Sequence, residues 1–471
     1  MTARAPSQWV VFAIVAVGVL MATIDSSIVN VSLPVIARSF GVPLGGAVAW
    51  VVIAYLVVVA SLLLTAGRLA DVVGRKGTWA AGLAVFTVGS ALCGAAPTLG
   101  WLVAFRALQG LGSAATMAVS PAMLVSAFPP EQRGKALGLN AVVVGVGVSL
   151  GPTLGGVITE HLGWRWIFYV NLPLGVLGVV ASLRLLAPHT PEARGRVDLL
   201  GAALLAAGLG ALTGGLSFGP EVGWTSAPLL ASDVVAALAL GGLVARVRSA
   251  PHPLIDPSLF SSRVFTSASV SLLLSFVSTF ALIFLLPFYL EQVRGLSAQE
   301  TGLLLTPLPL TTALIAPGAG TLADRFGTRG LAAGGMLVTA AGIALLAFAD
   351  AATPVPRLVA VLVALGVGRA AFQAPNSSAL MGAAPRERQG VAAGVLGTGR
   401  VLGQSLGVAF AGALFGVAGG AEAAQALRHA TLSPDASAAF LRGMQAALVG
   451  AAVVALASAA MALVRGREGR A

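Results

Sequence analysis

The sequence predicts an all-α membrane protein with fourteen transmembrane helices, in two six-helix bundles separated by two inserted helices. Three observations lead to this fold class: a very apolar composition, fourteen apolar segments long enough to cross a bilayer, and a polar turn that recurs at the same place in each half of the chain. The composition and the segments predict the class of protein, and the repeated turn predicts its internal division.

The composition excludes an ordinary water-soluble globule. Of the 471 residues, 57% are apolar and 10% are charged, whereas soluble domains carry about 25% charged residues. So few polar side chains cannot cover a globule of this size, but they suffice if lipid surrounds most of the exterior. The 59 glycines fit the same interpretation, because small residues let membrane helices approach one another closely.

Fourteen segments have the length that a membrane span requires, roughly 20 apolar residues. Charged or turn-forming residues separate them, and we expect Asp25 to be the single carboxylate within them. The segments lie near residues 9–33, 47–67, 78–97, 100–126, 135–158, 166–187, 199–218, 228–247, 266–290, 300–322, 330–349, 357–381, 390–415 and 442–464.

The distribution of lysine and arginine predicts the orientation. With the N-terminus in the cytoplasm, the inner segments hold nineteen of these residues and the outer loops hold six, while the acidic residues divide about evenly. An excess of cations alone on one side is the positive-inside pattern. The apolar stretch from Trp9 continues past Asp25 to Pro34 without a cleavage site, so we expect it to remain as the first span. The prediction is a multi-pass protein of the cytoplasmic membrane with both termini inside.

Several functions are disfavoured by the sequence. The net charge is +11, but the basic residues occur singly or in pairs, so we expect no nucleic-acid partner. The sequence has no Gly-x-x-x-x-Gly-Lys-Ser/Thr loop, its four histidines lie in separate loops, and Cys93 is its single cysteine. We therefore predict no enzyme, no metal site and no cofactor, with energy taken from an ion gradient. We expect a monomer whose partners are membrane lipid, protons and a small-molecule substrate.

The recurring polar turn predicts a duplication. Segment 67–76 recurs as segment 320–329, 253 residues later, with glycine, aspartate and glycine in register. Transporters whose halves rock about a central site are built from such repeats, so we predict an N-terminal bundle at 1–190, two inserted helices at 191–256 and a C-terminal bundle at 257–471. Contacts of these turns would break when the cytoplasmic side opens, which makes them a candidate latch. The latch residues are Gly67, Asp71, Gly74, Arg75, Gly320, Asp324, Arg325 and Gly327.

Four further motifs accompany the repeated turn: segment 25–34 in the first span, segment 106–112 in the fourth, a glycine-rich motif around Pro152 in the fifth, and segment 164–175 entering the sixth. With them the chain resembles the major facilitator superfamily and, within it, the fourteen-spanner drug:proton antiporters. The resemblance covers nearly the whole chain and implies the major facilitator fold and a proton-driven exporter. The fifth-span motif is similar to the one that marks proton-coupled exporters, and its residues here are Gly147, Gly151, Pro152, Gly155 and Gly156.

Asp25 is the residue that we predict to carry the proton. A carboxylate inside a span costs roughly 2.5–3.5 kcal/mol on insertion scales, and burial of a carboxyl group favours its neutral form, so it could bind and release a proton. We place Asp25 ~12 Å and Arg106 ~9 Å below the outer ends of their helices, so the two can form an ion pair. The resemblance also assigns proton coupling to this arginine. The alternative is a structural aspartate that is hydrogen-bonded near a helix end.

Gly151 and Pro152 predict a kinked fifth helix that packs closely on a neighbour. Proline removes a backbone hydrogen bond and kinks the helix, while the flanking glycines permit close contact. Such a helix could seal one side of the cavity against proton leak, as an exporter requires. Because glycine and proline are common in membrane helices, a purely structural role is the alternative.

Arg369 departs from what the resemblance implies, because relatives usually carry small residues there. It lies in the middle of its span, too far from either end to reach the membrane surface, so it must face protein or water. We expect it to line the cavity and to contact an anionic or polar group of the solute; the alternative is pairing with a helix C-terminus or asparagine side chains. Arg400 we expect to be structural. The predicted cavity residues are Asn30, Gln109, Arg369, Gln373, Asn376 and Phe284.

One carboxylate against three arginines within the spans predicts neutral, zwitterionic, monocationic or anionic amphiphiles as substrates, rather than dications. Three functions are open at this point. The first is a proton-coupled antiporter that exports drug-like compounds by alternating access. The second is an exporter of an endogenous lipid, siderophore or secondary metabolite, and the third is a non-transporting sensor on the same fold. The motifs favour the first.

Overall fold

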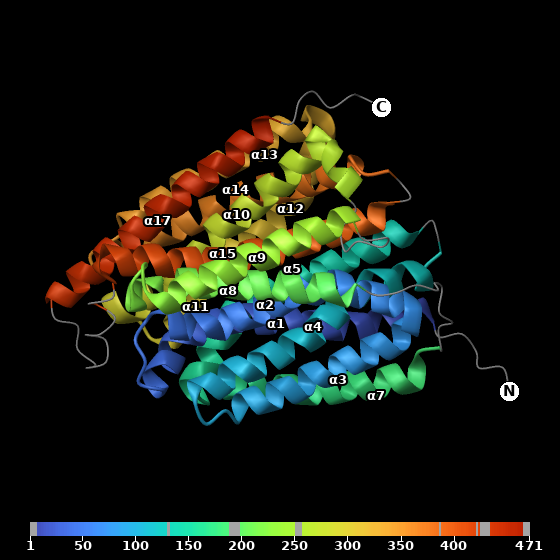
Figure 1. The fold of residues 1–471 in the computed structure, drawn as a ribbon, viewed down its shortest axis with the longest axis horizontal. Helices are drawn as coiled ribbons and strands as arrows, with labels where there is room; N and C mark the ends of the chain where they lie inside the picture. Colours follow the sequence, from blue (N-terminus) through green and yellow to red (C-terminus); the bar gives the residue numbers. More distant parts are fainter. Residues whose placement is uncertain are drawn as a thin grey trace.

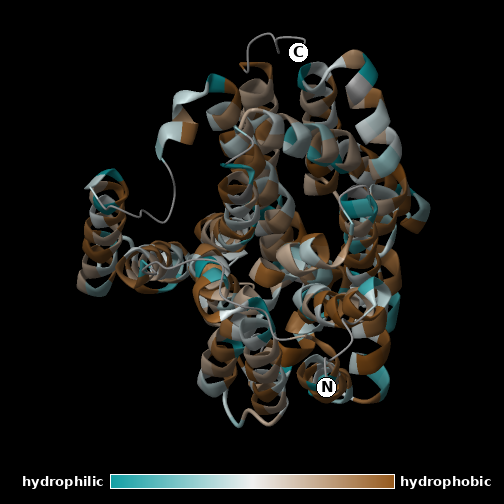
Figure 2. Ribbon diagram, turned by 90° about the vertical axis from the view of Figure 1, so that its right-hand side faces the viewer, coloured by the Kyte–Doolittle hydropathy of each residue, from teal (hydrophilic) through white to brown (hydrophobic). Residues whose placement is uncertain are grey.

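The computed structural model describes residues 7–129, 132–187, 198–249, 257–385, 388–420, 423 and 434–464, and these residues are almost entirely helical. Fourteen helices in this part of the chain are long and apolar enough to cross a membrane, which confirms the predicted fold class. Apolar residues cover most of the ribbon in Figure 2, and hydrophilic residues are sparse. The protein is therefore a multi-pass membrane protein.

The first half contains α1 (Gln8–Ser39), α2 (Gly46–Val73), α3 (Arg75–Gly94), α4 (Leu99–Ala127), α5 (Arg133–His161), α6 (Trp166–Tyr169) and α7 (Asn171–Leu185). The inserted helices are α8 (Leu199–Val222) and α9 (Ala227–Ser249). The second half contains η2 (Pro257–Ser261), α10 (Arg263–Phe288), η3 (Tyr289–Val293), α11 (Ala298–Leu305), α12 (Pro307–Phe326), α13 (Thr328–Ala347), α14 (Val355–Gly382), α15 (Gln389–Phe415), η5 (Gly416–Gly420) and α17 (Pro434–Leu463).

The helices pack mainly within their own half. Helices α1 and α5, α2 and α4, and α3 and α7 are neighbours in the first half; α10 and α15, α13 and α17, and α12 and α14 are neighbours in the second. In Figure 1 the second half occupies the upper part, the first half the lower part, and the start of α1 and the end of α17 lie toward the same end of the bundle. We call this end the terminal side and the other the distal side. The division at 1–190, 191–256 and 257–471 stays a prediction.

The inserted helices lie along the boundary between the halves. Helix α8 packs against α2 of the first half and α15 of the second, and α9 packs against α8. The backbone N–H of Gly46 donates to Glu221 of α8 at 2.8 Å. Asp198 caps α8 by accepting from the N–H of Gly201 and forms an ion pair with Arg246 of α9 at 3.0 Å. The Gly46 contact and the packing of α8 fix the hairpin to the bundle, and the Asp198 contacts hold its two helices together.

The structure corrects two expectations about the spans. Helix α1 continues through Pro34 to Ser39, beyond the predicted end at residue 33, since membrane helices tolerate proline where neighbours satisfy the freed backbone groups. Asp25 is also not the single carboxylate within the spans. Asp233 lies inside α9 and within the predicted span 228–247 itself, and Glu291 lies in the π-helical η3 that extends α10. The substrate prediction based on one carboxylate therefore loses part of its support.

The duplication is visible in the helix bounds. Helix α3 begins at residue 75 and α13 at residue 328, and both are 20 residues long. Each follows the preceding helix after one glycine, Gly74 with φ 113° and Gly327 with φ 86°. Side chains other than hydrogen strongly disfavour these backbone angles. A tight glycine turn at both latch positions was therefore correctly predicted.

We expect Gly74→Ala to lower the free energy of unfolding by about 1–3 kcal/mol, because alanine would be strained at a positive φ. The matched control is Gly77→Ala, one turn into α3, where an added Cβ would meet nothing within 4 Å. Thermal unfolding in detergent measures the difference. Equal melting temperatures for the two variants would contradict the argument.

Candidate functional site

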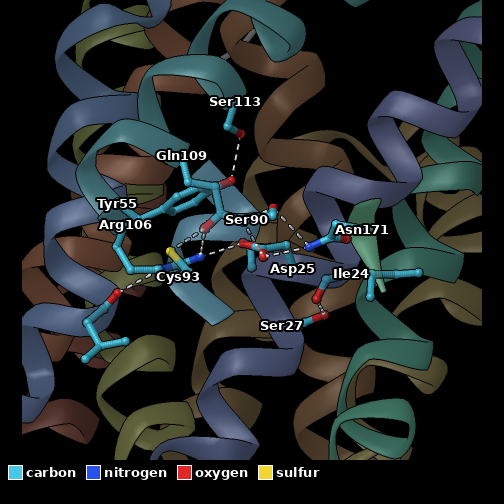
Figure 3. Close-up of polar contacts among 12 residues, drawn as sticks. Ile24, Asp25, Ser27, Tyr55, Ser90, Cys93, Arg106, Gln109, Ser113 and Asn171 are labelled. Atoms are coloured by element: carbon cyan, nitrogen blue, oxygen red, sulfur yellow. Dashed lines mark hydrogen bonds and ion pairs between the residues drawn. The ribbon is translucent and has the colours of Figure 1, made fainter. Parts of the chain in front are cut away.

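Asp25 lies in the middle of α1 with a fully buried side chain, and three donors surround it. Arg106 Nη1 donates to Oδ2 at 2.6 Å. Gln109 Nε2 and Asn171 Nδ2 donate to Oδ1 at 2.7 and 3.2 Å. Figure 3 shows these groups converging on the carboxylate. The expected contact between Asp25 and Arg106 is present.

Arg106 is 1% exposed and has several hydrogen-bond partners. Besides Asp25, it donates through Nε to the carbonyl of Val51 at 3.0 Å and through Nη1 to Gln109 Oε1 at 2.5 Å. Its guanidinium carbon lies 4.3 Å from the ring centroid of Tyr55. A buried ion pair is tolerated only when the remaining hydrogen-bonding groups are also satisfied, because desolvating two charges is costly. Here the carbonyl of Val51 and the side chain of Gln109 supply such groups for Arg106.

A second layer of polar side chains orients the first. Ser90 Oγ accepts from Gln109 Nε2 at 2.8 Å and from Asn171 Nδ2 at 3.4 Å, and Tyr55 and Ser113 share a hydrogen bond of 2.6 Å. Five elements, α1, α2, α3, α4 and α7, thus contribute to one network. Protonation of Asp25 would remove the charge that holds Arg106 and would weaken several contacts together.

The depth of the pair differs from the prediction. Asp25 lies fourteen residues before the end of α1, ~21 Å along the helix instead of ~12 Å. Arg106 lies seven residues after the start of α4, ~10 Å along it. The two still meet because α1 extends further on the distal side than its apolar stretch indicated.

The glycines of α5 form the surface on which α1 packs. A Cβ added to Gly155 would lie 2.8 Å from Ile28 Cγ1, and one added to Gly151 would lie 2.7 Å from Ser27 Cβ and closer still to its hydroxyl. Gly147 likewise faces Thr23. The motif therefore brings α5 against the segment of α1 that carries Asp25.

The opposite face of the same motif contacts the second half of the protein. A Cβ added to Gly156 would lie 2.9 Å from Gln299 Cα, and one added to Gly302 of α11 would lie 3.0 Å from the carbonyl carbon of Pro152. Thr153 and Thr306 share a hydrogen bond of 2.6 Å. Helix α5 is thus packed tightly against both halves.

An ion pair joins the two halves on the distal side. Arg38, near the end of α1, donates to Glu291 Oε2 in η3 at 2.8 Å, and the Glu291 side chain is 3% exposed. Nearby, the backbone N–H of Gln299 donates to Glu160 at 2.8 Å. These contacts join the two halves. Neither Arg38 nor Glu291 was predicted, because each lies at the margin of its apolar segment.

A small hollow lies in the middle of the second half. Its wall includes Ser275 and Phe276 of α10, Met336 of α13, and Arg369 and Gln373 of α14. Arg369 and Gln373, both predicted to line a cavity, are therefore brought together.

Comparison with known proteins agrees with this architecture. The model of the Major Facilitator Superfamily matches residues 15–308 and 268–470. The chain belongs to this superfamily. Its members are transporters, in agreement with the expectation that the chain is not an enzyme.

Several relatives in the superfamily share about a third of their residues with this chain. A riboflavin transporter of Clostridioides difficile is 35% identical over 87% of this chain and 88% of its own length. The multidrug resistance protein Stp of Mycobacterium tuberculosis is 34% identical over 84% and 74%. A tetracenomycin C resistance and export protein of Streptomyces glaucescens is 34% identical over 86% and 76%. These names describe the relatives.

A solved structure supports the fold. A bacterial homologue of the human lysosomal transporter Spinster aligns with a TM-score of 0.72 over 99% of this chain and 100% of that one, at 17% identity. The superfamily fold therefore extends over the whole chain.

The remaining predicted residues of this superfamily member lie as follows. In the first latch copy, Gly67 packs near Ala118, Asp71 is half-buried, and Arg75 donates to the carbonyl of Ala122 at 3.4 Å. In the second copy, Gly320 has open space around its Cα and Arg325 is exposed, while the Asp324 side chain lies outside the described residues.

Four predicted cavity residues occupy other environments. Gln109 belongs to the Asp25 network, and Phe284 is buried in the apolar core beside Phe288. Asn30 and Asn376 are buried and donate to the carbonyls of Ser26 and Ala268. Sequence reasoning missed Ser90 and Tyr55 as members of the network. Their polarity within otherwise apolar spans was the available signal.

We expect Gly151→Ala to push α5 away from α1 and to lower the free energy of unfolding by about 1–3 kcal/mol, as overpacking does. Transport should fall with it. Gly138→Ala is the matched control on the same helix, because its added Cβ would meet nothing within 4 Å. Thermal unfolding and transport by both variants are measured. An unaffected Gly151→Ala would show that this close contact is dispensable.

Proposed function

We propose that the protein is a proton-coupled antiporter that exports drug-like or amphipathic small molecules across the cytoplasmic membrane by alternating access. The observation that carries this proposal is the buried ion pair of Asp25 and Arg106, a titratable charge held in the middle of a membrane helix. Intramembrane ionisable residues mark ion pathways by default, because their burial is costly unless they serve a function. The relatives that confer drug resistance support the direction and the substrate class.

The charge distribution favours termini in the cytoplasm. In the sequence, nineteen Lys and Arg fall in the segments expected on the side where α1 begins, against six in the segments expected on the other side, and cytoplasmic loops carry the cationic excess. In this orientation, the contact between Arg38 and Glu291 closes the outer side. The arrangement is the one in which an exporter receives its substrate from the cytoplasm.

A transport cycle follows from these contacts. Substrate enters from the cytoplasmic side, the halves rock, the outer contacts separate and the latch segments close. With the outer side open, a proton neutralises Asp25 and frees Arg106. The return movement carries that proton inward, where Asp25 releases it and the pair forms again. No nucleotide is needed.

The energy available to such a cycle is sufficient for export. Each proton gains ~2.3 kcal/mol per 100 mV of membrane potential, and each pH unit adds about 1.4 kcal/mol. Since 1.4 kcal/mol corresponds to a tenfold concentration ratio, 100 mV alone supports a gradient of roughly fiftyfold for a neutral solute with one proton. One carboxylate per cycle therefore meets the requirement.

A second candidate function is transport of an endogenous metabolite, since a relative covered over 88% of its length is a riboflavin transporter. The scaffold and proton site would be unchanged, and only the occupant of the cavity would differ. Competition between riboflavin and rhodamine 123 for binding to purified protein separates the two functions. Tight binding of riboflavin without binding of rhodamine 123 would favour transport of the metabolite.

We expect Asp25→Asn to abolish proton-coupled export. Inside-out vesicles with an acidic interior are used, and the release of protons on addition of rhodamine 123 is followed with a pH-sensitive dye. Asp233→Asn is the matched control, because Asp233 also lies in a membrane helix but is exposed and remote from the network. Retained proton exchange in Asp25→Asn would overturn the proposal.

Loss of stability must be separated from loss of coupling in this test. Removing one partner of a buried pair costs about 3–5 kcal/mol, because an uncompensated charge remains. The double variant Asp25→Asn/Arg106→Gln removes that charge. It should be more stable than Asp25→Asn and still fail to couple.

We expect Glu291→Gln to loosen the outer closure, because the charge that holds Arg38 is lost. A cysteine placed at Ala298, which is 8% exposed, reports on the opening in a Cys93→Ala background. A membrane-impermeant maleimide should label it several-fold faster in Glu291→Gln. Glu300→Gln is the control, since Glu300 completes the capping box of α11 without joining the halves. Equal labelling rates would contradict a gating role.

A further inference from the structure

Two arginines approach one aromatic ring in the middle of the second half. The guanidinium carbons of Arg369, on α14, and Arg400, on α15, lie 5.5 and 5.6 Å from the ring centroid of Phe276 on α10. Each lies more than ten residues from either end of its helix. That is over ~15 Å from the helix ends, so neither head group can reach the membrane surface.

The charges of these arginines are not neutralised by the described part of the chain. The ion pairs there are Arg106 with Asp25, Arg38 with Glu291 and Arg246 with Asp198. Arg400 Nε is in addition buried without an acceptor among the described residues. A cation within a membrane helix costs roughly 2.5–3.5 kcal/mol, and two neighbouring cations repel each other. Arg106, by contrast, is a buried arginine whose charge is neutralised by a carboxylate of the same chain, Asp25.

The wall of the hollow beside Arg369 carries one cation and no carboxylate among the described residues. Gln373 and Arg369 line it from α14. The hydroxyl groups of Ser275 and Thr279 donate to carbonyls of their own helix and carry no charge, so they do not neutralise Arg369. Phe276 and Phe372 supply apolar walls. Guanidinium groups bind carboxylate and phosphate with matched geometry, and aromatic walls suit the apolar body of an amphiphile.

The hollow also lies on a helix that adjoins the other half. Helix α10 packs against α1, the helix of Asp25. A solute bound at Phe276 would therefore rest on an element that moves relative to the first half when the halves rock. This is the position that a transported molecule must occupy.

We propose that Arg369 and Arg400 bind an anionic group, a carboxylate, phosphate or sulfonate, of the transported amphiphile, with its apolar part against Phe276 and Phe372. The inference rests on the proposed function and names its substrate class: amphiphiles that carry an acidic group. Binding such a group offsets the uncompensated charge of the two arginines. It also assigns Arg400 to the substrate site, in place of the structural role that the sequence predicted.

Equilibrium binding of two matched dyes tests this site. Rhodamine 110 has a free carboxylate, and rhodamine 123 is its methyl ester. Fluorescence anisotropy is measured with the full chain in phosphatidylcholine nanodiscs, without any proton gradient. We expect rhodamine 110 to bind at least tenfold more tightly than the ester. Arg369→Gln and Arg400→Gln should each weaken rhodamine 110 at least tenfold and change the ester less than twofold.

Two further variants control for folding and for general charge effects. Arg369→Lys keeps the charge and should retain most of the preference for the acid. Arg357→Gln removes an exposed arginine at the start of the same helix, and should leave both affinities unchanged. Equal affinities for the two dyes, absence of binding, or equal weakening of both dyes by Arg369→Gln would overturn the proposal.

Nanodiscs that contain phosphatidylglycerol separate a solute from a lipid head group. If Arg369→Gln changes only the effect of this lipid, and leaves the affinity for rhodamine 110 intact, the pocket holds lipid and the proposal is overturned. The outcome is independent of proton coupling, because Asp25→Asn should keep the preference for the acid. Loss of that preference in a protein that still exchanges protons for rhodamine 123 would refute this inference alone.

Discussion

The ion pair between Asp25 and Arg106 is the interaction on which the first half depends. Five elements meet there, and each supplies a group that satisfies the pair or orients a partner. Away from water, such a network is favourable only when it is complete, since an unpaired charge in a low-dielectric interior is costly. The network is also sensitive to protonation of Asp25, because one added proton removes the charge around which the donors converge.

Helix α1 connects this charge to the boundary between the halves. Asp25 is followed within three residues by Ser27 and Ile28, which pack on the glycines of α5, and the helix ends near Arg38 and its partner Glu291. Arg38 and Glu291 are themselves 253 residues apart, the offset of the duplication. Residues at equivalent positions of two repeats can touch only near the axis that relates them. This ion pair therefore lies near that axis, where the rocking movement of the proposed cycle would separate its partners directly.

Much of this arrangement could be predicted from the sequence. The features that could not be predicted were missed for physical reasons. The spans and the glycine turns at Gly74 and Gly327 follow from hydropathy and from the backbone angles that glycine permits. The contact between Asp25 and Arg106 follows from two opposite charges inside apolar spans, although the predicted depth of Asp25 was too shallow. The side chain of Gln109 turns to Asp25 instead of a cavity, and sequence spacing does not fix such a rotamer. Phe284 packs beside Phe288 in the apolar core, and an aromatic residue within an apolar span does not by itself distinguish a cavity wall from the core.

The two halves have diverged in charge, and this bears on how coupling works. At the offset of 253 residues, Asp25 corresponds to Ser278 and Gly147 corresponds to Arg400. The first half thus holds a neutralised carboxylate, and the second holds cations without a carboxylate partner among the described residues. A proton and an acidic solute would then bind to different halves rather than compete for one carboxylate. Coupling in that case requires both to bias the same rocking movement, and the packed faces of α5, α1 and α11 are the surfaces through which each half can bias the other.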